Sequence, residues 1–317
     1  MILFISKRLA MGVGLVLLVL TLIFSALQLV PGDPAVLLLS TGDGGAPSPE
    51  AVAALREQLG LNQPLLTQYL SFLSGVFTGD LGESFRTSQP VLEAIGARLP
   101  RTLLLVAYAT ILSIVIGVAM GALAARRGGW VDTLVTALSS IGVALPVFVF
   151  GAVLILVFSI TLGLFPAGGY VDPSKDFLGA LKSLSLPAVS LAVGFAAQIA
   201  RMTRSAVLEV QTQDWVRTAK SIGLAPMTVF RRHVLRNSLT PVVTVVGIGF
   251  GTLLGSTVLV ERVFNYPGLS SLLVDGVTTR DYPVVQGVVI VIAMLFIAIN
   301  IIVDISYGIL DPRVRRA

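Results

Sequence analysis

Cysteine is absent from the 317-residue sequence, and histidine occurs only once, as His233. Without cysteine the chain can form neither a disulfide framework nor a thiolate metal site. A single histidine cannot by itself build a histidine-rich metal site, and it excludes the H-E-x-x-H motif of zinc proteases. These two absences say little about the cellular compartment, but they give no support to a metalloenzyme.

The motifs of common catalytic centres are also missing. No G-x-x-x-x-G-K-[ST] sequence occurs, because none of the four lysines follows a glycine, so the chain has no loop that cradles nucleotide phosphates. No G-x-S-x-G sequence flanks a serine. We therefore expect that the chain is not an enzyme and holds no cofactor of its own.

Charged residues are scarce, at 12% of the chain, whereas 55% of the residues are apolar and the mean hydropathy is +0.91. A soluble domain carries about 25% charged residues, so the surroundings of this chain are expected to be lipid. The net charge of +5 could indicate nucleic acid as a partner. The basic residues flank apolar runs instead of forming a polar domain, and we expect no nucleic-acid partner.

Six apolar runs are the main feature of the sequence, and a helix needs about 20 apolar residues to cross a bilayer. The fourth run is short, so it must extend to Leu208 and let Arg201 or Arg204 snorkel; a re-entrant or interfacial segment is the alternative. Pro146 and Pro187 are expected to kink or begin their helices. The sequence predicts an all-α polytopic membrane protein with six transmembrane helices. The runs are Leu9 to Val30, Thr102 to Ala125, Thr133 to Phe165, Leu186 to Ala200, Ser238 to Val260 and Pro283 to Val303.

The distribution of Lys and Arg predicts the orientation of these helices. With both termini inside, the inner segments hold 14 of the 22 basic residues and 5 acidic ones. The outer segments then hold 8 basic and 12 acidic residues, as the positive-inside rule requires. The first run is longer than a signal-peptide core and lacks an A-x-A site, so we expect it to be retained. The inner segments are 1–8, 126–132, 201–237 and 304–317.

Residues 31–100 form the one long polar insertion, between a first helix in 1–30 and a five-helix core in 101–310. Ser48 is expected to cap a helix that ends at Gly60. Pro64 begins a second helix, which the stretch Gly79 to Gly82 is expected to break. A third short helix is expected from Gln89-Pro90 to Leu99, with Pro100 leading into the second span. The insertion is either a structural cap or a surface for an external partner. The second helix is expected to lie in the membrane interface or to pack on the bundle, because it carries one apolar face. That face is formed by Leu66, Tyr69, Leu70, Leu73 and Phe77.

Polar groups within the runs are few, and Gln198 and Asn300 are expected to hydrogen-bond neighbouring helices. A secondary transporter driven by ions usually needs several intramembrane acids, which the sequence lacks, so this alternative is disfavoured. Small-residue ridges indicate tight helix packing. The ridges are Gly117 and Gly121 in the second run, and Gly247, Gly251 and Gly255 in the fifth.

The stretch 214–237 crowds basic residues between the fourth and fifth runs. A short helix is expected from Gln213 to Ile222, ended by Gly223, and a second from Pro226 through Arg236. A lone helix of about 10 residues is marginal in water, so a partner must hold it. Its face could dock into the groove of a protein or lie on lipid headgroups. That face holds Trp215, Val216, Ala219 and Ile222.

This stretch resembles the signature loop E-A-A-x-x-x-G-x9-I-x-L-P of ABC importer permeases. Arg217-Thr218-Ala219 stand in place of E-A-A, Gly223 is the glycine, and the last motif reads His233-Val234-Leu235-Arg236, so the Glu and the Pro are missing. Further stretches resemble the dipeptide, oligopeptide and nickel branch of this family, and the resemblance covers essentially the whole chain. They are Val30 to Pro34, Gly79 to Ser84, Arg98 to Pro100, Glu261 to Phe264 with Tyr266 to Gly268, and Tyr307 to Pro312.

The resemblance implies a type I importer permease in the bacterial inner membrane, forming half of a pathway with a second, related permease subunit. Two ATP-binding subunits hold ATP and Mg²⁺, and an extracytoplasmic binding protein delivers a substrate that is a dipeptide, oligopeptide, nickel, glutathione or another small solute. Loop 209–237 is then the cytoplasmic coupling loop, and 311–317 a cytoplasmic tail. The residues expected to form the ATPase-coupling helix are Asp214, Trp215, Arg217, Thr218, Ala219, Lys220, Ile222 and Gly223.

Overall fold

The computed structural model describes residues 2–29, 34–39, 48–58 and 60–310. Within these residues there is no β-strand, only an isolated bridge between Glu83 and Pro90, so the all-α prediction is confirmed. The resembling stretch at 30–33, the segment Gly42 to Pro47 and the tail 311–317 lie outside the described residues. The helices are α1 (Ile2–Gln28), α2 (Pro34–Leu39), α3 (Pro49–Gln58), α4 (Leu65–Thr78), α5 (Val91–Arg127), α6 (Gly129–Ala144), α7 (Val147–Leu154), the π-helix η1 (Ile155–Thr161), α8 (Phe177–Gln211), α9 (Asp214–Ser221), α10 (Pro226–Thr228), the π-helix η2 (Val229–Leu235), α11 (Arg236–Val263), α12 (Leu269–Thr279) and α13 (Tyr282–Leu310).

Five helical segments are each long and apolar enough to cross a membrane. The third expected span is broken: α6 and the α7–η1 segment are bent by 104° relative to each other, at the proline that was expected to kink or begin a helix. The described residues hold six candidate spans if this bent pair is counted as one. The break falls at Leu145 and Pro146, where Leu145 is extended at ψ 124°. A residue before proline is sterically pushed out of the helical region, so the strong bend follows from this dipeptide. The five segments are Ser6–Ala26, Val91–Arg127, Phe177–Gln211, Pro226–Val263 and Tyr282–Val303.

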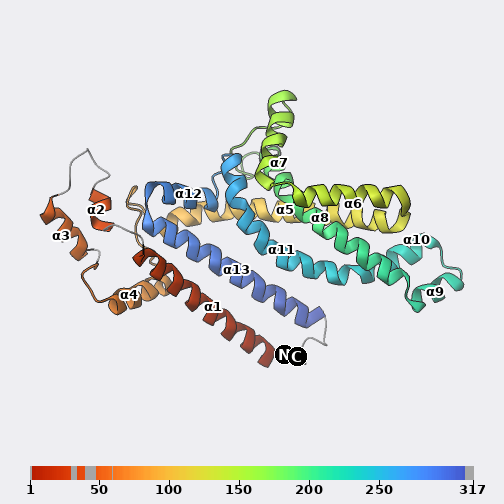
Figure 1. The fold of residues 1–317 in the computed structure, drawn as a ribbon, viewed down its shortest axis with the longest axis horizontal. Coiled ribbons are helices and arrows are strands. Elements are labelled where there is room, and N and C mark those ends of the chain that lie inside the picture. The colour runs from red at the N-terminus through yellow and green to blue at the C-terminus, as the bar shows by residue number, and fades with distance from the viewer. Residues whose placement is uncertain (1, 30–33, 40–47, 59, 311–317) are drawn as a thin grey trace. The chain divides into compact units, whose positions relative to one another are not determined.

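The chain divides into two compact units. One holds Leu99–Ser271 with short pieces from both ends of the chain, and its core surrounds α8, the most buried of the candidate spans. Figure 1 shows α8 running alongside α6 and α11, with which it makes its most extensive contacts. The other unit holds Ser6–Arg98 and Leu272–Ile297.

Helix α8 begins well before the fourth apolar run that was expected to form it. Asp176 caps its first turn by accepting a 2.9 Å hydrogen bond from the amide of Gly179. Pro187 lies inside the helix, so the expectation that it begins the helix was wrong. The backbone bond that Pro187 lacks is outweighed by packing, because its neighbours Leu184, Leu186 and Leu191 are buried in the core.

Helix α5 corrects a second expectation based on proline. The third short helix and the second span are one continuous helix, with Pro100 in its interior. Buried Val91 and Ile95 anchor the segment before Pro100, and buried Leu105 and Val106 anchor the segment after it. Packing on both sides therefore holds the helix together across the missing backbone bond.

The two glycine ridges differ in what they contact. A Cβ placed on Gly117 would lie 2.7 Å from the carbonyl oxygen of Ala196, and one on Gly121 would meet the carbonyl oxygen of Ala200. The expected close packing is therefore confirmed where α5 meets α8. In α11, Gly247 packs against Val303, but the side of Gly255 is open, so the second ridge is not one continuous contact face.

Arg204 does not snorkel. Its guanidinium forms a two-pronged ion pair with the carboxylate of Asp132, joining α8 to the first turn of α6. A planar guanidinium matches a carboxylate in this way, and the pair neutralises two charges that would otherwise lie beside apolar helices.

In the second unit, the turn after α4 is tied to the start of α13. The buried carboxylate of Asp281 accepts a 2.6 Å hydrogen bond from the Ser84 hydroxyl and a 3.2 Å bond from the Phe85 amide. The expected caps are confirmed: the Ser48 hydroxyl accepts a bond from the Ala51 amide in α3, and Gly79, with φ 81°, ends α4.

Candidate functional site

Helix α9 is short and closes with a well-defined backbone motif. The amide of Leu224 donates to the carbonyl of Ala219, and the amide of Gly223 donates to the carbonyl of Lys220. This pair of bonds is the Schellman arrangement, and it requires a left-handed residue just after the helix. Gly223 fills that position with φ 83°. The prediction that Gly223 ends this helix is therefore confirmed.

The charges of α9 complement the helix dipole. Asp214 lies in the first turn and Lys220 in the last, next to the positive and negative ends respectively. Arg217 forms an exposed ion pair with Asp214, with 3.4 Å between the charged atoms, and the Thr218 hydroxyl donates to the Asp214 carbonyl. Local interactions therefore support a helix that is too short to be stable alone.

The apolar residues of α9 do not form the single face that was expected. Val216 and Ala219 are buried within the chain, whereas Trp215 is 42% exposed and Ile222 is 70% exposed. The reason is angular: Trp215 and Ile222 are seven residues apart and lie on one side, next to the side that holds Val216 and Ala219. Ala219 therefore offers little surface to a partner, because its methyl group packs inward.

The inward side joins α9 to three other elements. One buried cluster brings the end of α5 and the last part of α8 together with α9 and η2. The Arg126 guanidinium also lies 5.5 Å from the ring centre of Phe230, in a cation–π contact between α5 and η2. A displacement of α9 would therefore act directly on three candidate spans, because η2 lies in the span Pro226–Val263. The cluster consists of Ala125, Val207, Val216, Ala219, Val229 and Val234.

The outward side presents the other expected site residues. Seven of the eight are exposed, with Ala219 as the exception. Leu224 and Met227, which follow the helix, are exposed as well and were not singled out from the sequence. The sequence gives only a weak indication that these two residues belong to the site, because apolar residues in turns are common on protein surfaces.

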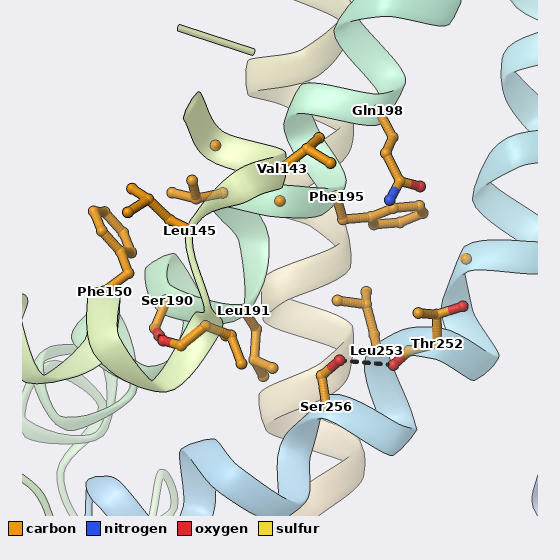
Figure 2. Close-up of a pocket in the computed structure, with 15 residues that line it drawn as sticks. Val143, Leu145, Phe150, Ser190, Leu191, Phe195, Gln198, Thr252, Leu253 and Ser256 are labelled. Carbon is orange, nitrogen blue, oxygen red and sulfur yellow. Dashed lines mark hydrogen bonds between the residues drawn. The ribbon is translucent and has the colours of Figure 1, made fainter. Parts of the chain in front are cut away.

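A cavity of about 130 Å³ lies between α6, α7, α8 and α11 (Figure 2). The bend at Leu145 helps to form it, and the Ser190 hydroxyl donates a 2.8 Å bond to the Val147 carbonyl beside the bend. The described residues that line it carry no charge and include both apolar and polar side chains. The polar side chains are Ser190, Gln198, Thr252 and Ser256.

Gln198 projects from α8 at this cavity, in the same region as Phe195 (Figure 2). A hydrogen bond to a neighbouring helix was expected from the sequence. Within the described part of the chain its amide instead makes no hydrogen bond, and the residue is exposed. The rotation of α8 about its own axis decides whether Gln198 faces a neighbouring helix or the cavity, and the sequence alone gives no signal for that rotation.

Comparisons with known proteins indicate a membrane component of a transport system. Residues 113–316 match the family described as binding-protein-dependent transport system inner membrane component, and residues 1–106 match the N-terminal family of such membrane components. A Brucella abortus (strain 2308) protein named as a peptide transport system permease is 46% identical over 98% of both chains. The glutathione transport system permease protein GsiC of Salmonella paratyphi A is 38% identical, again over 98% of both chains.

A solved structure of the MetNI methionine ABC transporter in inward-facing conformations is similar in fold. The TM-score is 0.58 with 21% sequence identity, over 71% of this chain and 100% of the other. The resemblance stated from the sequence is thus confirmed at the level of the family. Since the two family matches together leave only a few residues unmatched, this chain belongs to the inner membrane components of binding-protein-dependent transport systems.

Proposed function

We propose that this chain forms half of the translocation pathway of an ATP-driven importer for peptides or peptide-like solutes, and that α9 is its ATPase-coupling helix. The observation that carries the proposal is the two-sided build of α9: Val216 and Ala219 fix it to the chain, while Trp215 and Ile222 are exposed. The substrate class rests on relatives named for transport of peptides and of glutathione, itself a small peptide.

The orientation proposed from the positive-inside rule places both termini and loop 209–237 in the cytoplasm and residues 31–100 outside. The partners are a second permease subunit, two ATP-binding subunits below α9, and an external binding protein. Helix α3 suits contact with that protein, because its exposed charges Glu50, Arg56 and Glu57 could be matched by opposite charges.

In this mechanism the exposed side of α9 sits in a groove of an ATP-binding subunit. Closure of the ATP-binding subunits displaces α9, and the buried cluster passes the movement to the ends of α5 and α8. Packed helices move as rigid bodies, because a well-packed core has discrete arrangements and does not deform continuously.

The cavity beside the α6–α7 bend is proposed as part of the pathway. Its volume of about 130 Å³ is below the roughly 300–1,000 Å³ of small-molecule sites, so a peptide can enter only after the helices repack. Its neutral lining suits a backbone-rich solute that hydrogen bonds to Gln198, Thr252 and Ser256.

The test uses the assembled transporter in proteoliposomes with its binding protein. Ile222→Ala and Trp215→Ala are expected to reduce substrate uptake about 10-fold or more, with the ATPase no longer stimulated by the binding protein; a loss of 1.4 kcal/mol in coupling corresponds to tenfold. Ile160→Ala is the matched control, because Ile160 is also 70% exposed but lies in η1. Wild-type uptake and stimulation in both α9 variants would overturn the assignment of α9.

A further inference from the structure

Helix α4 packs on α1 through one of its sides. The rings of Phe24 and Tyr69 have centroids 5.3 Å apart, and those of Phe24 and Phe72 are 5.7 Å apart. The hydroxyls of Thr21 and Tyr69 share a 2.7 Å hydrogen bond. Aromatic packing and one polar bond therefore fix α4 against the last part of α1.

A second side of α4 is apolar but exposed. Leu66 is 68% exposed, Leu70 is 57% exposed and Phe77 is 66% exposed. These residues recur at spacings of four and seven, so they form one stripe beside the side that contacts α1. The third side is polar and carries no charge, since α4 contains no Asp, Glu, Lys or Arg. Its residues are Thr67, Gln68, Ser71, Ser74 and Thr78.

The position of α4 along α1 indicates what covers the exposed stripe. Thr21 and Phe24 precede the end of α1 at Gln28 by seven and four residues, which corresponds to about 10 Å and 6 Å along the axis. Both lie within the candidate span Ser6–Ala26. Helices that lie in a membrane interface are buried about 5–10 Å into the boundary between headgroups and acyl chains, which is the same depth.

The surface beside this contact is apolar and exposed. Leu15, Leu18 and Leu22 form an exposed stripe along α1, next to the side that holds Thr21. The exposed stripe of α4 and this stripe of α1 are thus both apolar, and each lies beside the contact between the two helices. The lack of charge on α4 fits the acyl boundary, whereas a face that docks on a soluble protein usually has a polar rim.

We propose that α4 lies in the plane of the membrane interface, with Leu66, Leu70 and Phe77 in the acyl region and the Ser and Thr side in the headgroups. The partner is the lipid surface itself. Because α4 has no charge, apolar burial and its contact with α1 hold it, and its insertion does not depend on anionic lipid. This helix fixes the 31–100 insertion to the bilayer at the end of α1.

The absence of cysteine makes a direct test available. Single variants Leu66→Cys, Leu70→Cys and Phe77→Cys, with Ser71→Cys and Ser74→Cys as controls, are spin-labelled in the assembled transporter in nanodiscs. Labels in the exposed stripe are expected to be accessible to oxygen and protected from a water-soluble nickel chelate, in zwitterionic and anionic lipid alike. Labels on the control side are expected to show the reverse.

Two results would overturn the proposal. Equal access of the chelate to the stripe and to the control side would place α4 in water. Protection of the stripe from both probes would mean that a protein covers it, either the second permease subunit or, if protection requires its addition, the binding protein. Substrate uptake by each labelled variant, compared with wild type, provides the folding control. The readout is independent of transport, so it distinguishes failure of this inference from failure of the proposed coupling role of α9.

Discussion

The Thr102 hydroxyl donates a 2.6 Å hydrogen bond to the carboxylate of Glu261, a residue that is fully buried. The same carboxylate accepts a 3.0 Å bond from the amide of Ser271, and the amide of Leu269 donates to the Thr102 oxygen. Ser271 is the third residue of α12, so Glu261 satisfies an amide that a capping side chain would otherwise bind. Helices α5, α11 and α12 are joined at this point.

A neighbouring contact adds to this junction. The Tyr266 hydroxyl donates a 2.9 Å bond to the Arg101 carbonyl. Burial, assisted by nearby Tyr170 and Glu261, raises the pKa of Tyr266. The hydroxyl therefore stays protonated and able to donate at any physiological pH.

Replacing Thr102 with Val is expected to destabilise the first unit by about 1–3 kcal/mol, because two buried hydrogen-bonding groups lose their partner without a change in shape. Thermal unfolding of the purified transporter in detergent measures the loss. Thr102→Ser keeps the hydroxyl and serves as the control, with a smaller expected loss. Equal stability of Thr102→Val and wild type would show that the bond contributes nothing.

The Asp132–Arg204 pair gives a second prediction. Asp132→Asn and Arg204→Gln are each expected to lower stability, and the double variant is expected to lose less than the sum of the two losses. The reason is that each single change leaves one charge without its partner between α6 and α8. Thermal unfolding of all four proteins completes the cycle. Strictly additive losses would mean that the pair is only a surface contact.

Local signals in the sequence were enough for much of the fold. Ser48 begins α3 and Gly79 ends α4 as expected, because a capping side chain or a left-handed glycine acts over only a few residues. Pro100 and Pro187 were wrongly expected to stand at the starts of helices. Tertiary packing compensates for the backbone bond that each proline lacks, and the residues next to a proline do not reveal the strength of that packing. Pro146 breaks its span far more strongly than a kink.

The candidate site was predictable only in part. The sequence placed α9 and its end at Gly223, yet it could not tell that Val216 and Ala219 face the chain while Trp215 and Ile222 face outward. That choice depends on Val207 and Val229, which lie in other elements of the buried cluster. Gln198 was missed as a cavity residue for the same reason, since helix rotation is set by tertiary contacts.

The glycines of α5 and α11 give a matched pair of variants. Gly121→Ala is expected to destabilise by about 1–3 kcal/mol, because its methyl group would collide with the backbone of Ala200 on α8. Gly255→Ala meets open space and is expected to be neutral or slightly more stable. Thermal unfolding distinguishes the two, and an equal loss in both variants would contradict the close approach of α5 to α8.

The end of α9 gives the final prediction. Gly223 has φ 83°, and a Cβ at this position would meet no atom of this chain within 4 Å, so within the chain any effect of substitution comes from the backbone and not from crowding. Gly223→Val is expected to cost about 1–2 kcal/mol of local backbone energy and to reorient Leu224 and the chain after it. Gly223→Asn should cost less, because Asn tolerates the left-handed region.

If α9 couples ATP hydrolysis to transport, Gly223→Val is expected to hydrolyse ATP without uptake, while Gly223→Asn keeps most of the wild-type uptake. Both are measured in proteoliposomes that contain the binding protein and equal amounts of assembled transporter. Similar uptake by the two variants would mean that the left-handed turn is dispensable, since the variants differ chiefly in how well they adopt it. Loss of uptake in both, with normal assembly, would instead assign the requirement to the lack of a side chain at residue 223, for which the open space around it gives no reason.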